Sequence, residues 1–132
     1  MVRLDEALKQ RMSVHLEAFC ADISGLRNAV IASVDGFALV SASNGQGKGE
    51  RLAAMTSAML ALAAAVGREL ELGEMEVLIL EAGRGKVLML SLPASPQPLL
   101  LMAACDQSCV IGRALWRAKE CGRAIVAELG GK

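Results

Sequence analysis

The stretch LAAMTSAMLALAAAVG, residues 52–67, decides the fold, because its sixteen residues carry no charge. Ala, Leu and Met favour helices and no Pro interrupts them, so we expect one helix over residues 49–72. Two stripes run along this helix, one of large side chains and one of small side chains about 110° away. One stripe can cover a sheet of the same chain, whereas the other requires a second close neighbour. The large stripe is Leu52, Met55, Met59, Leu62 and Val66, and the small stripe is Ala54, Ala58, Ala61 and Ala65.

Composition places the chain among single-domain proteins with unusually few aromatic residues. It has 132 residues, of which 54 % are hydrophobic and 2 % aromatic, so Leu, Val, Ala and Met must build the core. The formal net charge is zero, which argues against binding of nucleic acid or of a membrane surface. Because a lipid span needs about 20 apolar residues, the apolar excess indicates a surface hidden in an oligomer. Charged residues precede the first apolar run, so we expect no signal peptide, a cytoplasmic location and reduced cysteines.

Hydrophobic periodicity and turn residues predict the other elements. We expect strands over residues 29–34, 37–43, 75–80, 86–92 and 99–105, and further helices over residues 3–23 and 110–129. Asp35-Gly36 predicts a hairpin between the first two strands. The predicted order is αββαβββα in one domain over residues 1–132. This is an α+β fold with a five-stranded, largely antiparallel sheet and helices on both faces.

Three pieces of the sequence together resemble the Roadblock family, which includes dynein light chains and bacterial regulators of Ras-like GTPases. They are GLRNAVIASVDGFALVSAS (residues 25–43), LAAMTSAMLALAAAVGREL (52–70) and LLLMAACDQSCVIGRALWRA (99–118). The likeness covers about residues 4–129 and lies in a pattern of side-chain sizes and turns, including the spacing from Asp106 to Gly112.

The resemblance implies a homodimer or heterodimer. In such a dimer, the third strand of each subunit lies at a sheet edge and pairs with the third strand of the mate. The two Ala-rich helices lie side by side over this joint. We then expect the large stripe to pack on the subunit's own sheet and the small stripe to meet the mate. In a monomer, the third helix or a loop would cover the small stripe instead. The predicted dimer interface is Ala54, Ala58, Ala61, Ala65, Met75, Val77 and Ile79.

The glycine-rich loop before the long helix superficially resembles a nucleotide-binding loop. The loop is Gly45-Gln46-Gly47-Lys48-Gly49, but Glu50 and Leu52 stand where a dinucleotide-binding frame needs Gly. No Lys follows Gly49, as a phosphate-binding loop requires. We therefore predict no bound nucleotide and no other cofactor.

Metal and catalytic sites find little support either. Cys105, Cys109 and Cys121 lack a fourth metal ligand, because His15 is the only His and lies on a distant helix. We interpret the four cysteines, Cys20 included, as small buried thiols, with modest reactivity conceivable at Cys109 near a helix start. No carboxylate that could orient His15 for catalysis is identifiable from spacing.

Several Arg residues and the only Trp are candidates for contact with a partner. Trp116 lies away from the main apolar stripe of the last predicted helix, with Arg113 near it, and Trp and Arg are typical interface anchors. The alternative is that Trp116 packs on the first helix or at the rim of the core. Arg51 and Arg68 are further candidate contacts, and with Arg84 they are candidates for insertion into a GTPase site.

Two function hypotheses from different classes follow. The resemblance implies a dimeric, non-enzymatic module that binds and regulates a small Ras-like GTPase. The second hypothesis is a light-chain-like scaffold that dimerises larger proteins without regard to nucleotide. An enzyme or small-molecule binder would need a polar pocket that the sequence does not reveal.

Overall fold

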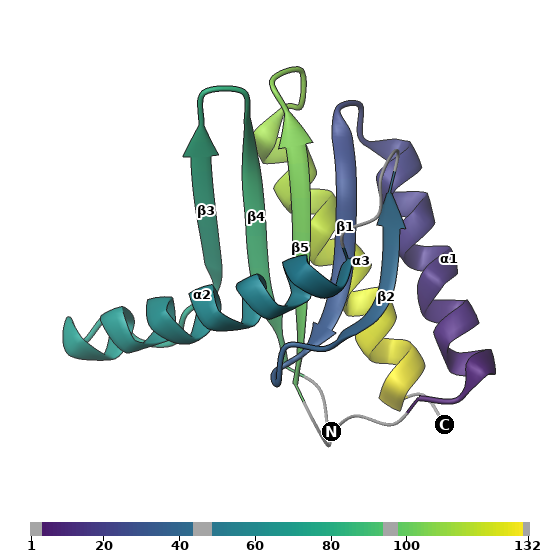
Figure 1. Ribbon diagram of the computed structural model, residues 1–132, viewed down its shortest axis with the longest axis horizontal. Coiled ribbons are helices and arrows are strands. Elements are labelled where there is room, and N and C mark those ends of the chain that lie inside the picture. The colour runs from purple at the N-terminus through teal and green to yellow at the C-terminus, as the bar shows by residue number, and fades with distance from the viewer. Residues whose placement is uncertain (1–3, 44–48, 94–97, 131–132) are drawn as a thin grey trace.

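The computed structural model describes residues 4–43, 49–93 and 98–130. Five strands form one sheet, and three helices pack on its two faces (Figure 1). The predicted order and fold class are confirmed. The elements are α1 (Glu6–Asp22), β1 (Leu26–Ser33), β2 (Ala38–Ser43), α2 (Gly49–Glu69), β3 (Val77–Ala82), β4 (Gly85–Leu92), β5 (Leu99–Asp106) and α3 (Ile111–Gly130).

The strands lie in the order β2-β1-β5-β4-β3, and every neighbouring pair is antiparallel. The unbroken apolar run of β5 lies at the centre of the sheet, as a strand covered on both faces requires. Each end of the sheet is a hairpin, β1–β2 on one side and β3–β4 on the other. The edge position predicted for the third strand is therefore confirmed within the subunit.

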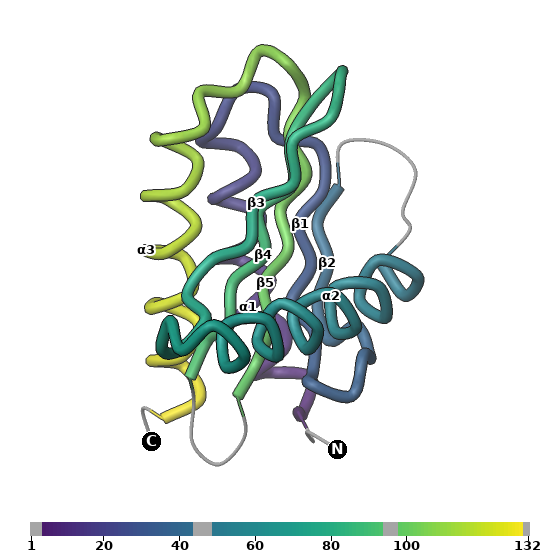
Figure 2. Tube along the Cα trace, turned by 90° about the vertical axis from the view of Figure 1, so that its left-hand side faces the viewer, coloured from purple at the N-terminus to yellow at the C-terminus, as the bar shows by residue number. Residues whose placement is uncertain are grey.

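Alternation along the strands divides the core into two layers. On β4, Leu88 and Leu90 belong to the cluster under α1 and α3, whereas Met89 belongs to the cluster under α2. Figures 1 and 2 show α1 and α3 on one face and α2 crossing the other. The α1/α3 layer is the larger one, and its buried members include Met12, Leu16, Phe19, Ala118, Cys121 and Ile125.

Local features fix the α1/α3 layer on the sheet. The Asp5 carboxylate accepts a hydrogen bond of 2.8 Å from the Leu8 amide and caps the start of α1. A Cβ at Gly122 would lie 2.5 Å from a methyl of Leu92, so the absence of a side chain lets α3 approach β4. Helix α1 packs over β1 and β2, and α3 packs over β4 and β5. Neither helix passes behind β3 in Figure 1.

The face of α2 that packs on the sheet differs from the predicted face. Helix α2 contacts the sheet through Ala53, Thr56 and Leu60, a face about 110° from the large stripe at 100° per residue. Leu52 and Met59 are half-buried at the margin of this contact. The other three members of the large stripe are exposed, namely Met55 at 53 %, Leu62 at 68 % and Val66 at 50 %. The prediction that the large stripe covers the subunit's own sheet is thus wrong for these three.

The sheet explains why a smaller face of the helix is buried. Large side chains rise from the strands beneath α2, among them Met89, Leu100 and Met102. They fill the layer from below, so the helix fits closely with Ala53 and Thr56 turned inward. The Thr56 hydroxyl is buried and has no hydrogen-bond partner among the described residues.

Candidate protein-interaction surface

Helix α2 presents an apolar surface to solvent over most of its length. Met55, Leu62 and Val66 are half or more exposed, and Leu70 and Leu72 continue the surface beyond the last turn. Beside them, Ala54, Ala58 and Ala61 are exposed and Ala65 is half-buried. Met55, Ala54 and Ala58 face away from the sheet on which Ala53 and Thr56 are packed, and Figure 1 shows that the C-terminal part of α2 extends past β3 and has no strand beneath it. We call Met55, Leu62, Val66, Leu70 and Leu72 together with the small stripe the α2 surface.

Strand β3 borders the α2 surface and has one free edge. Among the described residues it pairs only with β4, from Val77 opposite Leu90 to Ala82 opposite Gly85. Ile79 is 46 % exposed, while Met75 and Val77 are half-buried against the two core clusters. An apolar edge strand with free backbone groups invites pairing with another chain. The structure thus places the seven predicted interface residues on α2, on β3 and on the segment between them, with Ala65, Met75 and Val77 half-buried.

An exposed apolar helix of this kind can also be a membrane-spanning helix. Among the described residues, α2 alone has the length and hydropathy of a membrane span, with a mean hydropathy of 1.2 and 17 % of that window buried. Lipid cannot surround it in this fold, because Ala53, Thr56 and Leu60 are packed on the sheet. A protein surface is the cover that leaves the fold unchanged.

The candidate partner-contact residues fall on three separate surfaces. Arg51 and Arg68 are exposed at opposite ends of α2, about 25 Å apart at 1.5 Å per residue. Arg84 is exposed in the β3–β4 turn. Arg113 and Trp116 lie on α3, on the other face of the sheet. The structure therefore does not gather these residues into one site.

Trp116 is not part of the core. The residue is 60 % exposed and belongs to neither core cluster, and the alternative in which its ring packs at the rim of the core stays a prediction. Arg117 occupies the space between α3 and α1 instead, 2.8 Å from the Asp22 carboxylate and 5.7 Å from the centre of the Phe19 ring. Trp116 remains a candidate anchor for a partner.

The cysteines are part of the core, and one is more accessible than the rest. Cys20, Cys105 and Cys121 are buried, as predicted, whereas Cys109 is half-buried. Burial raises the pKa of Cys20 to about 11 and the pKa of Cys105 and Cys121 to about 12. These three thiols are therefore neutral and poor nucleophiles. Within the described residues, no group of three or more His, Cys, Asp or Glu side chains could hold a metal ion.

His15 has a carboxylate partner that its sequence position did not reveal. Its Nε2 lies 2.9 Å from Glu128 of α3, and Arg11 lies 2.9 Å from the other oxygen of the same carboxylate. The hydrogen bond with His15 is the main cause that lowers the pKa of Glu128. This cluster ties α1 to α3 at the surface. The glycine-rich loop lies outside the described residues except for Gly49.

Comparison with known proteins gives one family and one fold. A model of the Roadblock/LC7 domain matches residues 15–94. MglB from Myxococcus xanthus has the same fold, with a TM-score of 0.83 and 14 % identity over 99 % of this chain and 96 % of that chain. The gliding protein MglB of Thermus thermophilus has a TM-score of 0.84 and 17 % sequence identity, over 98 % of this chain and 96 % of that chain. An MglB with a tetrameric arrangement has a TM-score of 0.83 and 18 % sequence identity, over 95 % of this chain and 92 % of that chain. No curated protein sequence matches the chain.

Proposed function

This chain belongs to the Roadblock/LC7 domain family, and on that premise we propose that it is a homodimeric, non-enzymatic module that binds and regulates a small Ras-like GTPase. The family that the sequence resembles includes bacterial regulators of such GTPases. The similarity of the fold to MglB structures over nearly the whole chain supports the same role. The single observation that carries the proposal is the exposed α2 surface, because a folded subunit of this size rarely leaves so continuous an apolar face uncovered.

A twofold mate is the cover that the structure fits best. Both the α2 surface and the free edge of β3 lie at the same end of the sheet. A second copy that pairs β3 with β3 would extend the sheet, and the overhanging half of each α2 would then lie over the joint. Exposed Ala54, Ala58 and Ala61 allow two helices to approach closely. The tetrameric arrangement of one MglB shows self-association in that protein.

The dimer creates a composite surface on which a GTPase can dock. In this proposal Arg68, at the overhanging end of α2, is the cation of α2 nearest the joint. Arg51 lies at the other end of α2, about 25 Å away at 1.5 Å per residue, and Arg84 lies in the β3–β4 turn. An arginine inserted into a GTPase site can raise hydrolysis about 10³- to 10⁵-fold. If Arg51→Ala, Arg68→Ala and Arg84→Ala each leave stimulated hydrolysis unchanged, regulation works by rearranging the GTPase's own residues.

The experiment that tests the proposal is affinity capture from the native cytoplasm, where we place the protein. The tagged protein is incubated with cell extract in a non-hydrolysable GTP analogue or in GDP, and bound proteins are identified by mass spectrometry. We expect a Ras-like GTPase whose recovery depends on the nucleotide. A protein recovered equally in both nucleotides would instead favour the light-chain-like scaffold.

A further inference from the structure

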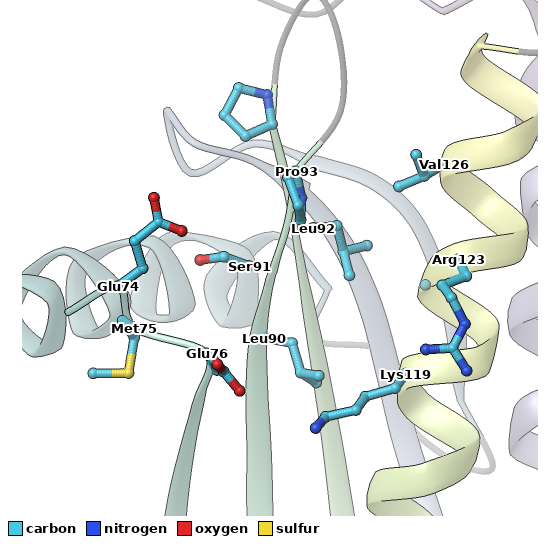
Figure 3. Close-up of a pocket in the computed structure, with 12 residues that line it drawn as sticks. Glu74, Met75, Glu76, Leu90, Ser91, Leu92, Pro93, Lys119, Arg123 and Val126 are labelled. Carbon is cyan, nitrogen blue, oxygen red and sulfur yellow. The ribbon is translucent and has the colours of Figure 1, made fainter. Parts of the chain in front are cut away.

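The cavity between α3 and the β3–β4 hairpin has no role in the proposed function. Its volume is about 480 Å³, and it lies on the α1/α3 face of the sheet, opposite to α2 (Figure 3). It exists because α1 and α3 cover only four of the five strands. Its apolar lining comes from the segment just before β3, from the end of β4 and the residue after it, and from α3, and includes Met75, Leu90, Leu92, Pro93 and Val126.

Charged side chains line two opposite walls of this groove. Lys119 projects from α3 toward Leu90, Arg123 lies one turn further along α3, and Glu74 and Glu76 lie on the strand side of the groove (Figure 3). All four residues are exposed. None forms an ion pair within the part of the chain that the structure describes. The groove therefore has two cations on one side and two anions on the other, none of them paired with another described residue.

Exposed apolar side chains continue the groove toward the β3–β4 turn. Ile79 points to the same face as Val77, two residues earlier, and is opposite the buried Leu88 of β4. On α3, Trp116 precedes Lys119 by three residues and Arg123 by seven, so all three share one side of the helix. Both Ile79 and Trp116 are uncovered, at 46 % and 60 % exposure. Apolar surface flanked by charge thus continues along β3 as far as Ile79, and Glu81, which alternation puts on the same face, ends it.

We propose that this groove binds an amphipathic helix of a partner protein. An extended peptide gains affinity from backbone hydrogen bonds at a sheet edge, but the groove opens on the face of the sheet, where backbone groups are already paired. A helix satisfies its own backbone and can rest its apolar stripe on Leu90 and Ile79. Its acidic flank would face Lys119 and Arg123, and its basic flank would face Glu74 and Glu76.

The length of β3, along which the partner helix would lie, sets the length of this occupant. Strand β3 has six residues, about 20 Å, which corresponds to a helix of about 13 residues. A helix beside α3 at the usual axial spacing of about 8–10 Å would cover β3, the strand that α3 leaves bare. It would complete the α1/α3 layer as a third helix. Pairing of β3 with a mate would leave the site open, because pairing uses the edge of the strand and not its face.

A designed peptide tests the proposal directly. The probe is a helical peptide of about 13 residues with a Leu stripe, Glu on one flank and Lys on the other. Trp116 is the only Trp in the chain, so its fluorescence reports binding at the groove. We expect a blue shift of its emission that saturates with peptide. The double variant Lys119→Glu with Arg123→Glu should raise the apparent Kd at least about tenfold, by loss of two charge-assisted contacts.

Two controls make the result specific. The double variant Arg51→Glu with Arg68→Glu makes the same change in net charge on the opposite face, and it should leave the Kd within about twofold. A peptide of the same composition in scrambled order should not bind. The proposal is overturned if Trp116 emission does not respond to the ordered peptide at millimolar concentration. It is also overturned if the scrambled peptide binds equally, or if reversal of Lys119 and Arg123 has no effect. These outcomes do not depend on GTPase capture, which concerns the α2 side of the sheet.

Discussion

Leu62→Glu should separate the proposed dimer without unfolding the subunit. Leu62 is 68 % exposed in the subunit, so a charge at this position remains hydrated in the monomer. Full burial of a Leu contributes about 1.5–3 kcal/mol, so covering the exposed part at the joint contributes about 1–2 kcal/mol per subunit. The substitution removes this gain from both subunits and buries two like charges, each of which costs several kcal/mol. We therefore expect the dimer Kd to rise by at least about a hundredfold.

Sedimentation equilibrium over a range of concentrations measures this effect. The wild-type protein should sediment at twice 13.8 kDa and the Leu62→Glu variant at the monomer mass, with the same far-UV circular dichroism. Val14→Glu provides the matched control, because Val14 is 55 % exposed on α1 and distant from the joint. The reasoning is refuted if Leu62→Glu dimerises with the wild-type Kd, or if Val14→Glu dissociates to the same extent.

Three further predictions concern stability and the thiols. Gly25 has φ +91°, and a Cβ there would lie 2.5 Å from the Asp106 carboxylate, so Gly25→Ala should lower stability by at least about 2 kcal/mol in denaturant unfolding. Because burial raises the folded-state pKa of Cys121 from 9.0 to about 12, stability should fall as pH rises from 9 toward 12, and Cys121→Ala should reduce that slope in unfolding measured across this range. In the native protein an aromatic disulfide reagent should modify the half-buried Cys109 rapidly and the three buried thiols only after unfolding; rapid reaction of all four would contradict the burial.

The order of elements was predictable because each one carries its own local signal. Asp35-Gly36 marks a hairpin, the period of α1 marks one buried face, and the apolar run of β5 marks a central strand. The two edges of the sheet follow from the hairpins. None of these inferences needs the volume of a side chain in another element, which is why they hold.

The face of α2 that meets the sheet was not predictable in the same way. Periodicity alone shows that the helix is apolar on several sides, and we expected the largest side chains to be buried. The choice depends on Met89, Leu100 and Met102, which rise from the sheet and leave room only for small residues. Their orientation follows from strand pairing and alternation, so no stretch of α2 contains the answer.

The groove beside α3 was missed for a similar reason. Glu74 and Glu76 are more than forty residues from Lys119 and Arg123 in the chain, and only the fold brings them to opposite walls. One signal was available, since Trp116, Lys119 and Arg123 share a helix side. That signal places the three residues together and says nothing about the bare strand opposite.

The rate of GTP hydrolysis by the captured GTPase tests the proposed regulation most directly. Nucleotide release and single-turnover hydrolysis are measured on the purified GTPase, with increasing amounts of the wild-type protein or of Leu62→Glu. We predict that the dimeric wild type changes one of the two rates in a saturable way and that the monomeric variant does not. If saturating wild-type protein leaves both rates unchanged, the protein does not regulate that GTPase.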